Sequence, residues 1–102
     1  MTKIEVIDRI KELRFNANLS ARELSLRVEK NEAYVNRLES KKSFEPSVSA
    51  LLEMIAACGS TPAEFFYHNM SQYKIDQEII NKLNQLSIEK KSAVIAMINQ
   101  LL

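Results

Sequence analysis

Residues 19–39 carry the sequence LSARELSLRVEKNEAYVNRLE, which has the pattern of two short helices joined by a tight turn. Ser20 and Glu23 have the S-x-x-E spacing of a capping box, in which each side chain binds the other residue's free backbone N–H. After a break at residues 29–31, Asn31 is the expected cap of the second helix. Four apolar residues at helical spacing are expected to close a small core: Leu24, Val28, Val35 and Leu38.

The second helix of this stretch is expected to present a polar face to solvent. Its outward residues are Glu32, Ala33, Asn36, Arg37 and Ser40. A helix face of short polar groups with one Arg can fit the major groove of DNA.

The flanking segments also have helical patterns. Residues 3–14 are expected to form a helix that ends at Arg14, and Asn18 suits the left-handed residue after it. Ser47 is the expected cap of a fourth helix, and Gly59 is the expected residue that ends it. The expected core positions of that helix are Val48, Leu51, Leu52, Ile55 and Ala56. A second capping box, Thr61-Pro62-Ala63-Glu64, precedes Phe65 and Phe66, which are expected to complete the core.

Together these segments resemble the phage-repressor, or Xre/Cro-like, helix-turn-helix family, from about Ile4 to Phe66. The resemblance implies an all-α, five-helix domain and a sequence-specific DNA-binding transcriptional regulator, a repressor that binds a palindromic operator as a homodimer. It also implies a structural ion pair between Arg14 and Glu39. The turn departs from the family pattern, because Glu29 stands where Gly is usual and Lys30 where an apolar residue is usual. The turn is therefore either strained or differently shaped.

The resemblance assigns the contacts with double-stranded DNA by position. The residues that would face the bases are Glu32, Ala33, Asn36 and Arg37. Those that would contact phosphate are Arg22, Tyr34, Ser40, Lys41 and Lys42. The family often has a phosphate-binding Gln where Ala21 stands, and Arg22 is the expected replacement.

The last third of the chain has a different pattern, so we expect two domains, residues 1–67 and 68–102. Residues 73–86 and 88–102 are two amphipathic segments with Ser87 as a cap between them, which predicts a C-terminal helical hairpin. Its continuous apolar faces predict a contact surface. The hairpin either packs on its own domain or pairs with a second copy, and we expect it to be a dimerisation element.

Composition limits the class of protein. The chain has 102 residues, of which 46% are hydrophobic, with one Gly and two Pro, and this scarcity of helix breakers favours an all-α fold. The charged start is unlike a signal peptide, and no apolar run approaches the ~20 residues that span a bilayer. With a single Cys as well, we expect a cytoplasmic protein without a membrane partner.

No group of residues predicts catalysis. Cys58 lies in an apolar stretch and His68 in a polar linker, whereas a structural zinc site needs four ligands. A single Gly excludes a glycine-rich phosphate-binding loop. We therefore expect neither an enzyme nor a cofactor nor a metal.

Charge keeps a second hypothesis open. Residues 1–66 contain ten Lys or Arg and ten Asp or Glu, so the domain carries no net charge with which to attract DNA. The alternative is a protein-interaction module of the same fold that has lost DNA binding. Ala21, Glu29 and Glu32 favour this alternative, whereas the extent of the resemblance favours DNA binding.

Overall fold

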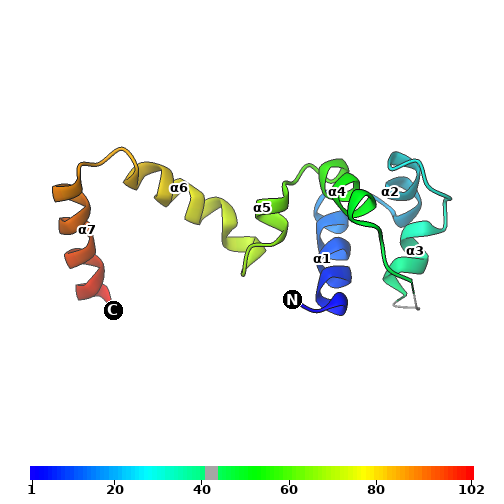
Figure 1. Ribbon diagram of the computed structural model, residues 1–102, viewed down its shortest axis with the longest axis horizontal. Coiled ribbons are helices and arrows are strands. Elements are labelled where there is room, and N and C mark those ends of the chain that lie inside the picture. Colours follow the sequence, from blue (N-terminus) through cyan, green and yellow to red (C-terminus); the bar gives the residue numbers. More distant parts are fainter. Residues whose placement is uncertain (41–43) are drawn as a thin grey trace. The chain divides into compact units, whose positions relative to one another are not determined.

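The computed structural model describes residues 1–40 and 44–102, and the chain divides into two compact units, Met1–Phe66 and Tyr67–Leu102. Throughout the described residues the regular structure is helical (Figure 1). Unit 1 contains α1 (Lys3–Asn16), α2 (Ala21–Arg27), α3 (Tyr34–Glu39), α4 (Val48–Ala57) and α5 (Pro62–Phe65). Unit 2 contains the 3₁₀ turn η1 (Met70–Gln72), α6 (Tyr73–Leu83) and α7 (Ile88–Leu101). The expected all-α fold with a helix-turn-helix is confirmed.

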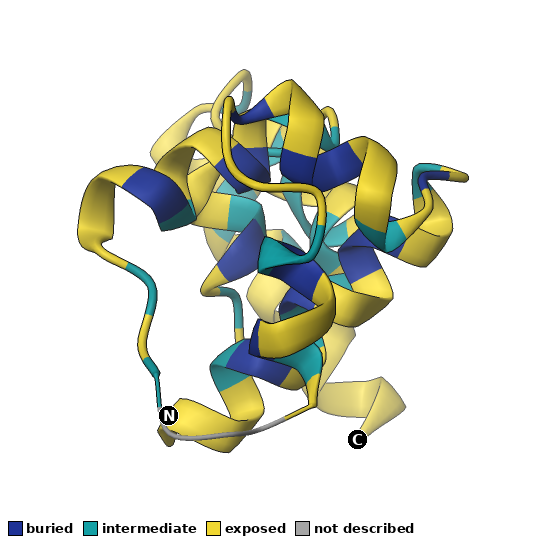
Figure 2. Cartoon of the chain, turned by 90° about the vertical axis from the view of Figure 1, so that its right-hand side faces the viewer, coloured by how far each residue is buried: buried dark blue, intermediate teal, exposed yellow. Residues whose placement is uncertain are grey.

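The core of unit 1 is made by the inner sides of its five helices (Figure 2). It joins the four apolar residues expected from α2 and α3 to residues of the other helices. Its largest fully buried side chains are Phe65, Ile7, Ile10, Leu24, Leu38, Met54, Ile55 and Val35. Because α1 and α4 both contribute to this core, they hold α2 and α3 in place.

Three helices of unit 1 end in the same hydrogen-bonded motif with three different residues. Asn18, Glu29 and Gly59 have φ of 57°, 57° and 75° and follow α1, α2 and α4. After α2, the N–H of Glu29 donates to Leu26 at 3.1 Å and that of Lys30 to Ser25 at 2.9 Å, which is the Schellman pattern. Glu29 therefore adopts the left-handed conformation that Gly would adopt, so the turn keeps the common shape and carries the strain.

At α2, α4 and α5 the helix starts follow the expected side-chain caps with one difference. Ser20 and Glu23 form a complete capping box, as expected. Thr61 accepts a hydrogen bond from the N–H of Glu64, but the Glu64 carboxylate accepts from the Ser60 hydroxyl instead of returning a bond to Thr61. The second expected capping box is thus only half formed, because the Glu64 carboxylate is hydrogen-bonded to the Ser60 hydroxyl and not to the N–H of Thr61.

Two predictions about the core were wrong in part. Of the expected core positions of α4, Ile55 is buried and Leu51 is half-buried, but Val48, Leu52 and Ala56 are exposed. The buried residues of this helix are Ala50, Met54 and Ile55. Ser49 and Glu53 are the polar residues of α4, and they lie four residues apart on its exposed side. The apolar residues Val48, Leu52 and Ala56 share that side, which is why apolar character alone predicted the wrong positions. Phe65 is fully buried, but Phe66 is 49% exposed and meets it edge to face, because α5 ends there.

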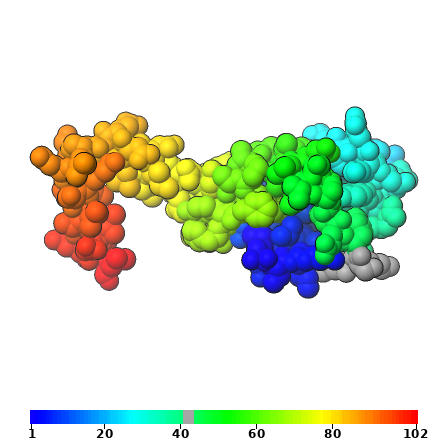
Figure 3. All heavy atoms as spheres, viewed as in Figure 1, coloured from blue at the N-terminus to red at the C-terminus, as the bar shows by residue number. Residues whose placement is uncertain are grey.

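Unit 2 has no buried residue, although both of its helices are amphipathic. Ser87 caps α7 as expected, and α6 ends at Leu83 instead of Leu86 because three turn hydrogen bonds close residues 84–86. In the space-filling view the two helices leave an open angle between them (Figure 3). No helix among the described residues is long and apolar enough to cross a membrane.

The left-handed residue Glu29 allows a direct test of the strain in the turn. We expect Glu29→Gly to stabilise the protein by roughly 0.5–1 kcal/mol, since the relief of about 1–2 kcal/mol of strain exceeds the entropy cost of Gly. Thermal melts measure this change. Asn18→Gly is the matched control and should give no comparable gain, because Asn tolerates this conformation better. Equal shifts for the two variants would show that Glu29 is not strained.

Candidate nucleic-acid interface

The segment that connects α2 to α3 places the start of the second helix later than expected. Asn31 is not its cap: the Asn31 side chain accepts the N–H of Ala33 at 2.9 Å, and its carbonyl accepts the N–H of Tyr34. The helix therefore begins at Tyr34, and Glu32 and Ala33 form a turn in front of it. Local hydrogen bonds by the short Asn side chain compete here with helix formation.

Ser25 supplies the cap that α3 lacks in its own sequence. This fully buried residue of α2 donates its hydroxyl to the carbonyl of Ala21 at 2.7 Å and accepts the N–H of Val35 at 2.9 Å. One hydroxyl thus satisfies a free N–H of α3 and fixes the start of α3 against α2. Sequence reasoning missed this residue, because the only signal was a small polar residue beside Leu24 on the packed side of α2.

Arg14 and Glu39 fix the other end of α3. The Arg14 Nε and Nη2 atoms each donate to a different Glu39 oxygen at 2.7 Å, and Nη1 donates to the carbonyl of Leu19 at 2.9 Å. The two side chains are only 10% and 8% exposed. The hydrogen bonds that Arg14 donates to the Glu39 carboxylate raise the pKa of Arg14, although burial lowers it. A two-pronged, nearly buried pair of this kind joins the last turn of α1 to the last residue of α3.

The outward side of α3 presents two of the four expected base-facing residues to solvent. Asn36 and Arg37 are exposed, between the buried residues Val35 and Leu38. Glu32 is also exposed, but it lies in the turn before α3, and Ala33 is half-buried. The outward side of the helix-turn-helix therefore presents an amide, a guanidinium and a carboxylate to solvent.

The residues expected at phosphates are in several different environments. Arg22 donates through Nε to Glu32 Oε2 at 3.1 Å, and both side chains are mostly exposed. Tyr34 is half-buried, packs edge-on against Phe44 at 5.4 Å between ring centroids, and has a pKa raised by burial. Ser40 donates its hydroxyl to the carbonyl of Arg37. Lys41 and Lys42 lie outside the described residues.

One comparison with known proteins agrees with this geometry. A sequence profile of the helix-turn-helix family matches residues 10–65, more than half of the chain. The chain belongs to the Xre/lambda-repressor-like helix-turn-helix family. This is a family of DNA-binding transcription regulators and not of enzymes. No curated protein and no solved structure matches the chain significantly. The family match runs from the middle of α1 to the end of α5 and leaves unit 2 uncovered.

The remaining reactive groups do not gather into a second site in the described part of the chain. Across residues 1–40 and 44–102, no three His, Cys, Asp or Glu side chains are placed to hold one metal ion. Cys58 is half-buried at the end of α4, and burial raises the pKa of its thiol, so the thiol stays protonated near neutral pH.

Arg14 and Glu39 should be energetically coupled. We expect Arg14→Ala and Glu39→Ala each to destabilise the fold by about 3 kcal/mol, because each leaves a nearly buried charge unpaired. The double variant should lose less than the sum of the two. Thermal and urea melts of the four proteins measure the coupling energy between the two side chains. The exposed pair Arg22–Glu32 is the control, and its coupling energy should be at most about 1 kcal/mol. Strict additivity at Arg14 and Glu39 would contradict the structural role.

Proposed function

We propose that this protein is a sequence-specific transcriptional repressor that binds a palindromic operator as a homodimer in the cytoplasm. The observation that carries the proposal is the position of Asn36 and Arg37 on the exposed side of a short helix that is fixed at both ends. Ser25 holds its first turn, and the Arg14–Glu39 pair holds its last residue. A helix held in this way can present a constant face to DNA.

The chemistry of that face supports base recognition in the major groove. Arg37 can donate two hydrogen bonds to guanine, and Asn36 can bind the N6 and N7 edge of adenine. Glu32 can accept from the amino group of cytosine, and Ala33 can contact a thymine methyl group. Arg22, Tyr34, Ser40, Lys41 and Lys42 are the proposed phosphate contacts. Of these, Ser40 would have to release its bond to the carbonyl of Arg37 in order to donate to phosphate.

One observation favours the alternative, a protein-interaction module that has lost DNA binding. Glu32 neutralises Arg22 at the place where a free cation would attract phosphate. The family membership and the exposed Arg37 favour DNA. Selection from random duplexes decides between the two, because a module that has lost DNA binding enriches no sequence.

Arg37 offers the sharpest test of base recognition. We expect Arg37→Ala to weaken binding of the selected site by about 1–3 kcal/mol and to remove the sequence preference at one position. The melting temperature should hardly change, because the side chain is exposed. Arg27→Ala is the matched control: it removes the same charge from the exposed last residue of α2 and should leave the preference unchanged. Equal binding of the selected site by Arg37→Ala and the wild type would refute this assignment.

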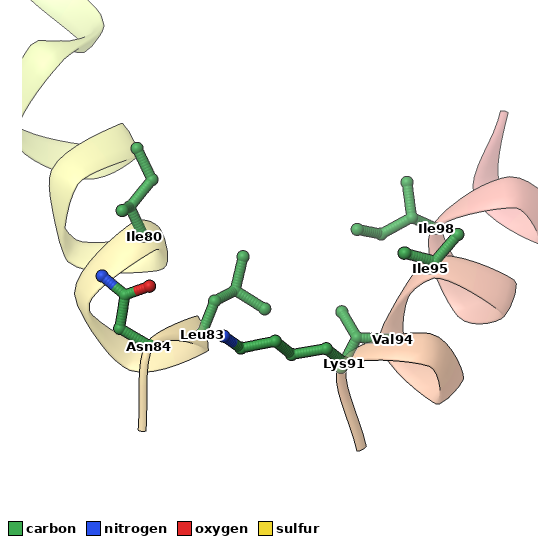
Figure 4. Close-up of a pocket in the computed structure, with 7 residues that line it drawn as sticks. All are labelled: Ile80, Leu83, Asn84, Lys91, Val94, Ile95 and Ile98. Carbon is green, nitrogen blue, oxygen red and sulfur yellow. The ribbon is translucent and has the colours of Figure 1, made fainter. Parts of the chain in front are cut away.

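The proposed dimer rests on unit 2. Its two helices leave a hollow of ≈ 280 Å³ that is lined by Ile80, Leu83, Asn84, Lys91, Val94, Ile95 and Ile98 (Figure 4). The apolar side chains of both helices point into this groove and do not meet in a packed seam. Ile80, Ile95 and Ile98 remain 42%, 59% and 43% exposed. An apolar face of this kind is typical of an interface, and two copies can bury it in a four-helix arrangement.

A two-fold dimer also fits what a short recognition helix can do. One such helix reads only a few base pairs, whereas two related by a two-fold axis can contact half-sites about one DNA turn, ~34 Å, apart. The competing possibility is that the groove packs on its own domain. A dimer is favoured because unit 1 already has a packed core that includes the fully buried Phe65. Unit 1 therefore does not need the groove of unit 2 to complete its own core.

Sedimentation equilibrium on the full chain tests the dimer. We expect the wild type to be dimeric at tens of micromolar and Ile98→Glu to be monomeric, because the variant places a charge in the groove. Met97→Glu is the matched control: it adds the same charge to an exposed neighbouring position outside the groove lining and should remain dimeric. A monomeric wild type would exclude this interface. A monomeric Met97→Glu would show that the groove is not the specific site of dimerisation.

A further inference from the structure

The ion pair between Arg22 and Glu32 joins two parts of the helix-turn-helix that would both face DNA. Arg22 is the second residue of α2, and Glu32 lies in the turn that leads into α3. Their Nε and Oε2 atoms are 3.1 Å apart, and the side chains are 68% and 62% exposed. Exposed pairs contribute little to stability, so this pair can open when a better partner is present.

The two members of the pair respond to DNA in opposite ways. Phosphates attract Arg22 and repel Glu32, so the pair as a whole gains little from the charge of the DNA backbone. If Arg22 moves to a phosphate, the Glu32 carboxylate loses its hydrogen bond beside a row of negative charges. That separation is more favourable when the DNA offers Glu32 a donor in place of Arg22.

Cytosine is the base whose own major-groove edge offers such a donor without a competing acceptor. Its major-groove edge carries the N4 amino group alone, whereas adenine adds the N7 acceptor and guanine and thymine present acceptors. An acceptor next to a carboxylate repels it. The identity of one base can therefore decide whether the pair opens.

We propose that Arg22 and Glu32 form a discrimination switch that rejects DNA without a correctly placed cytosine. On other sequences Glu32 retains Arg22, and the phosphate contact of Arg22 is not made. At a site with the cytosine, Glu32 accepts from N4 and Arg22 is released to a phosphate, so both contacts form together. This inference rests on the proposed DNA-binding function and makes Glu32 and Arg22 specificity-determining residues.

The test compares the full-length wild type, Glu32→Gln and Arg22→Gln on the selected duplex and on an unrelated duplex over a range of salt concentrations. For Glu32→Gln we expect about tenfold tighter binding of unrelated DNA, because Arg22 is released to a phosphate. The plot of log binding constant against log salt concentration should become steeper by about one, which corresponds to one added phosphate contact. The preference for cytosine at one position should disappear. For Arg22→Gln we expect weaker binding of the selected duplex with a slope lower by about one, and no gain in binding of unrelated DNA, because the Glu32 carboxylate then lacks its cation.

Glu12→Gln is the control for net charge, because it removes one negative charge from an exposed position on α1. It should leave the ratio of selected to unrelated binding unchanged. If the wild type selects a site but Glu32→Gln behaves like Glu12→Gln, the switch is refuted while DNA recognition stands. A selected site without a Glu32-dependent cytosine refutes the assignment of the base. If neither the wild type nor Glu32→Gln binds any duplex at low salt, the DNA-binding function and the switch fail together.

Discussion

The guanidinium of Arg14 is the group on which the arrangement of the helix-turn-helix depends. It is nearly buried, so its charge is stable there only because Glu39 and the carbonyl of Leu19 accept three of its hydrogen bonds. Those acceptors belong to the end of α3 and to the entry into α2. One side chain of α1 therefore sets the position of both helices of the motif, and the planar guanidinium allows little variation in their geometry.

The recognition helix needs this support because it is short. A helix of six residues is not stable by itself in water. Forming its first turn costs more backbone conformational entropy than the first hydrogen bond contributes in free energy. Ser25 at its first turn and Arg14 at its last residue supply tertiary bonds, and Val35 and Leu38 supply burial. None of these groups lies on the outward side. The residues proposed to contact bases can therefore change without loss of the fold, which separates specificity from stability.

Local sequence signals predicted the features that depend on neighbouring residues. The capping box at Ser20, the left-handed Asn18 and Gly59, and the all-α class all follow from short-range patterns. The start of α3 did not, because its cap comes from Ser25 on another helix and Asn31 forms a local turn instead. The inward side of α4 was predicted only in part, since Ile55 is buried but Leu52 and Ala56 lie on the exposed side with the polar residues of the helix. The resemblance suggested the outward residues of α3, but the pairing of Arg22 with Glu32 is visible only in three dimensions.

Charge balance and unit 2 belong to the same physical argument. A domain with equal numbers of basic and acidic residues gains little affinity from counterion release, so one copy would bind DNA weakly. Linking two such domains makes the second contact intramolecular and multiplies affinity without adding charge to either copy. An apolar groove between α6 and α7 that unit 2 does not fill itself is the kind of surface such a link requires. A protein that discriminates by paired charges therefore has a physical reason to obtain its affinity from dimerisation.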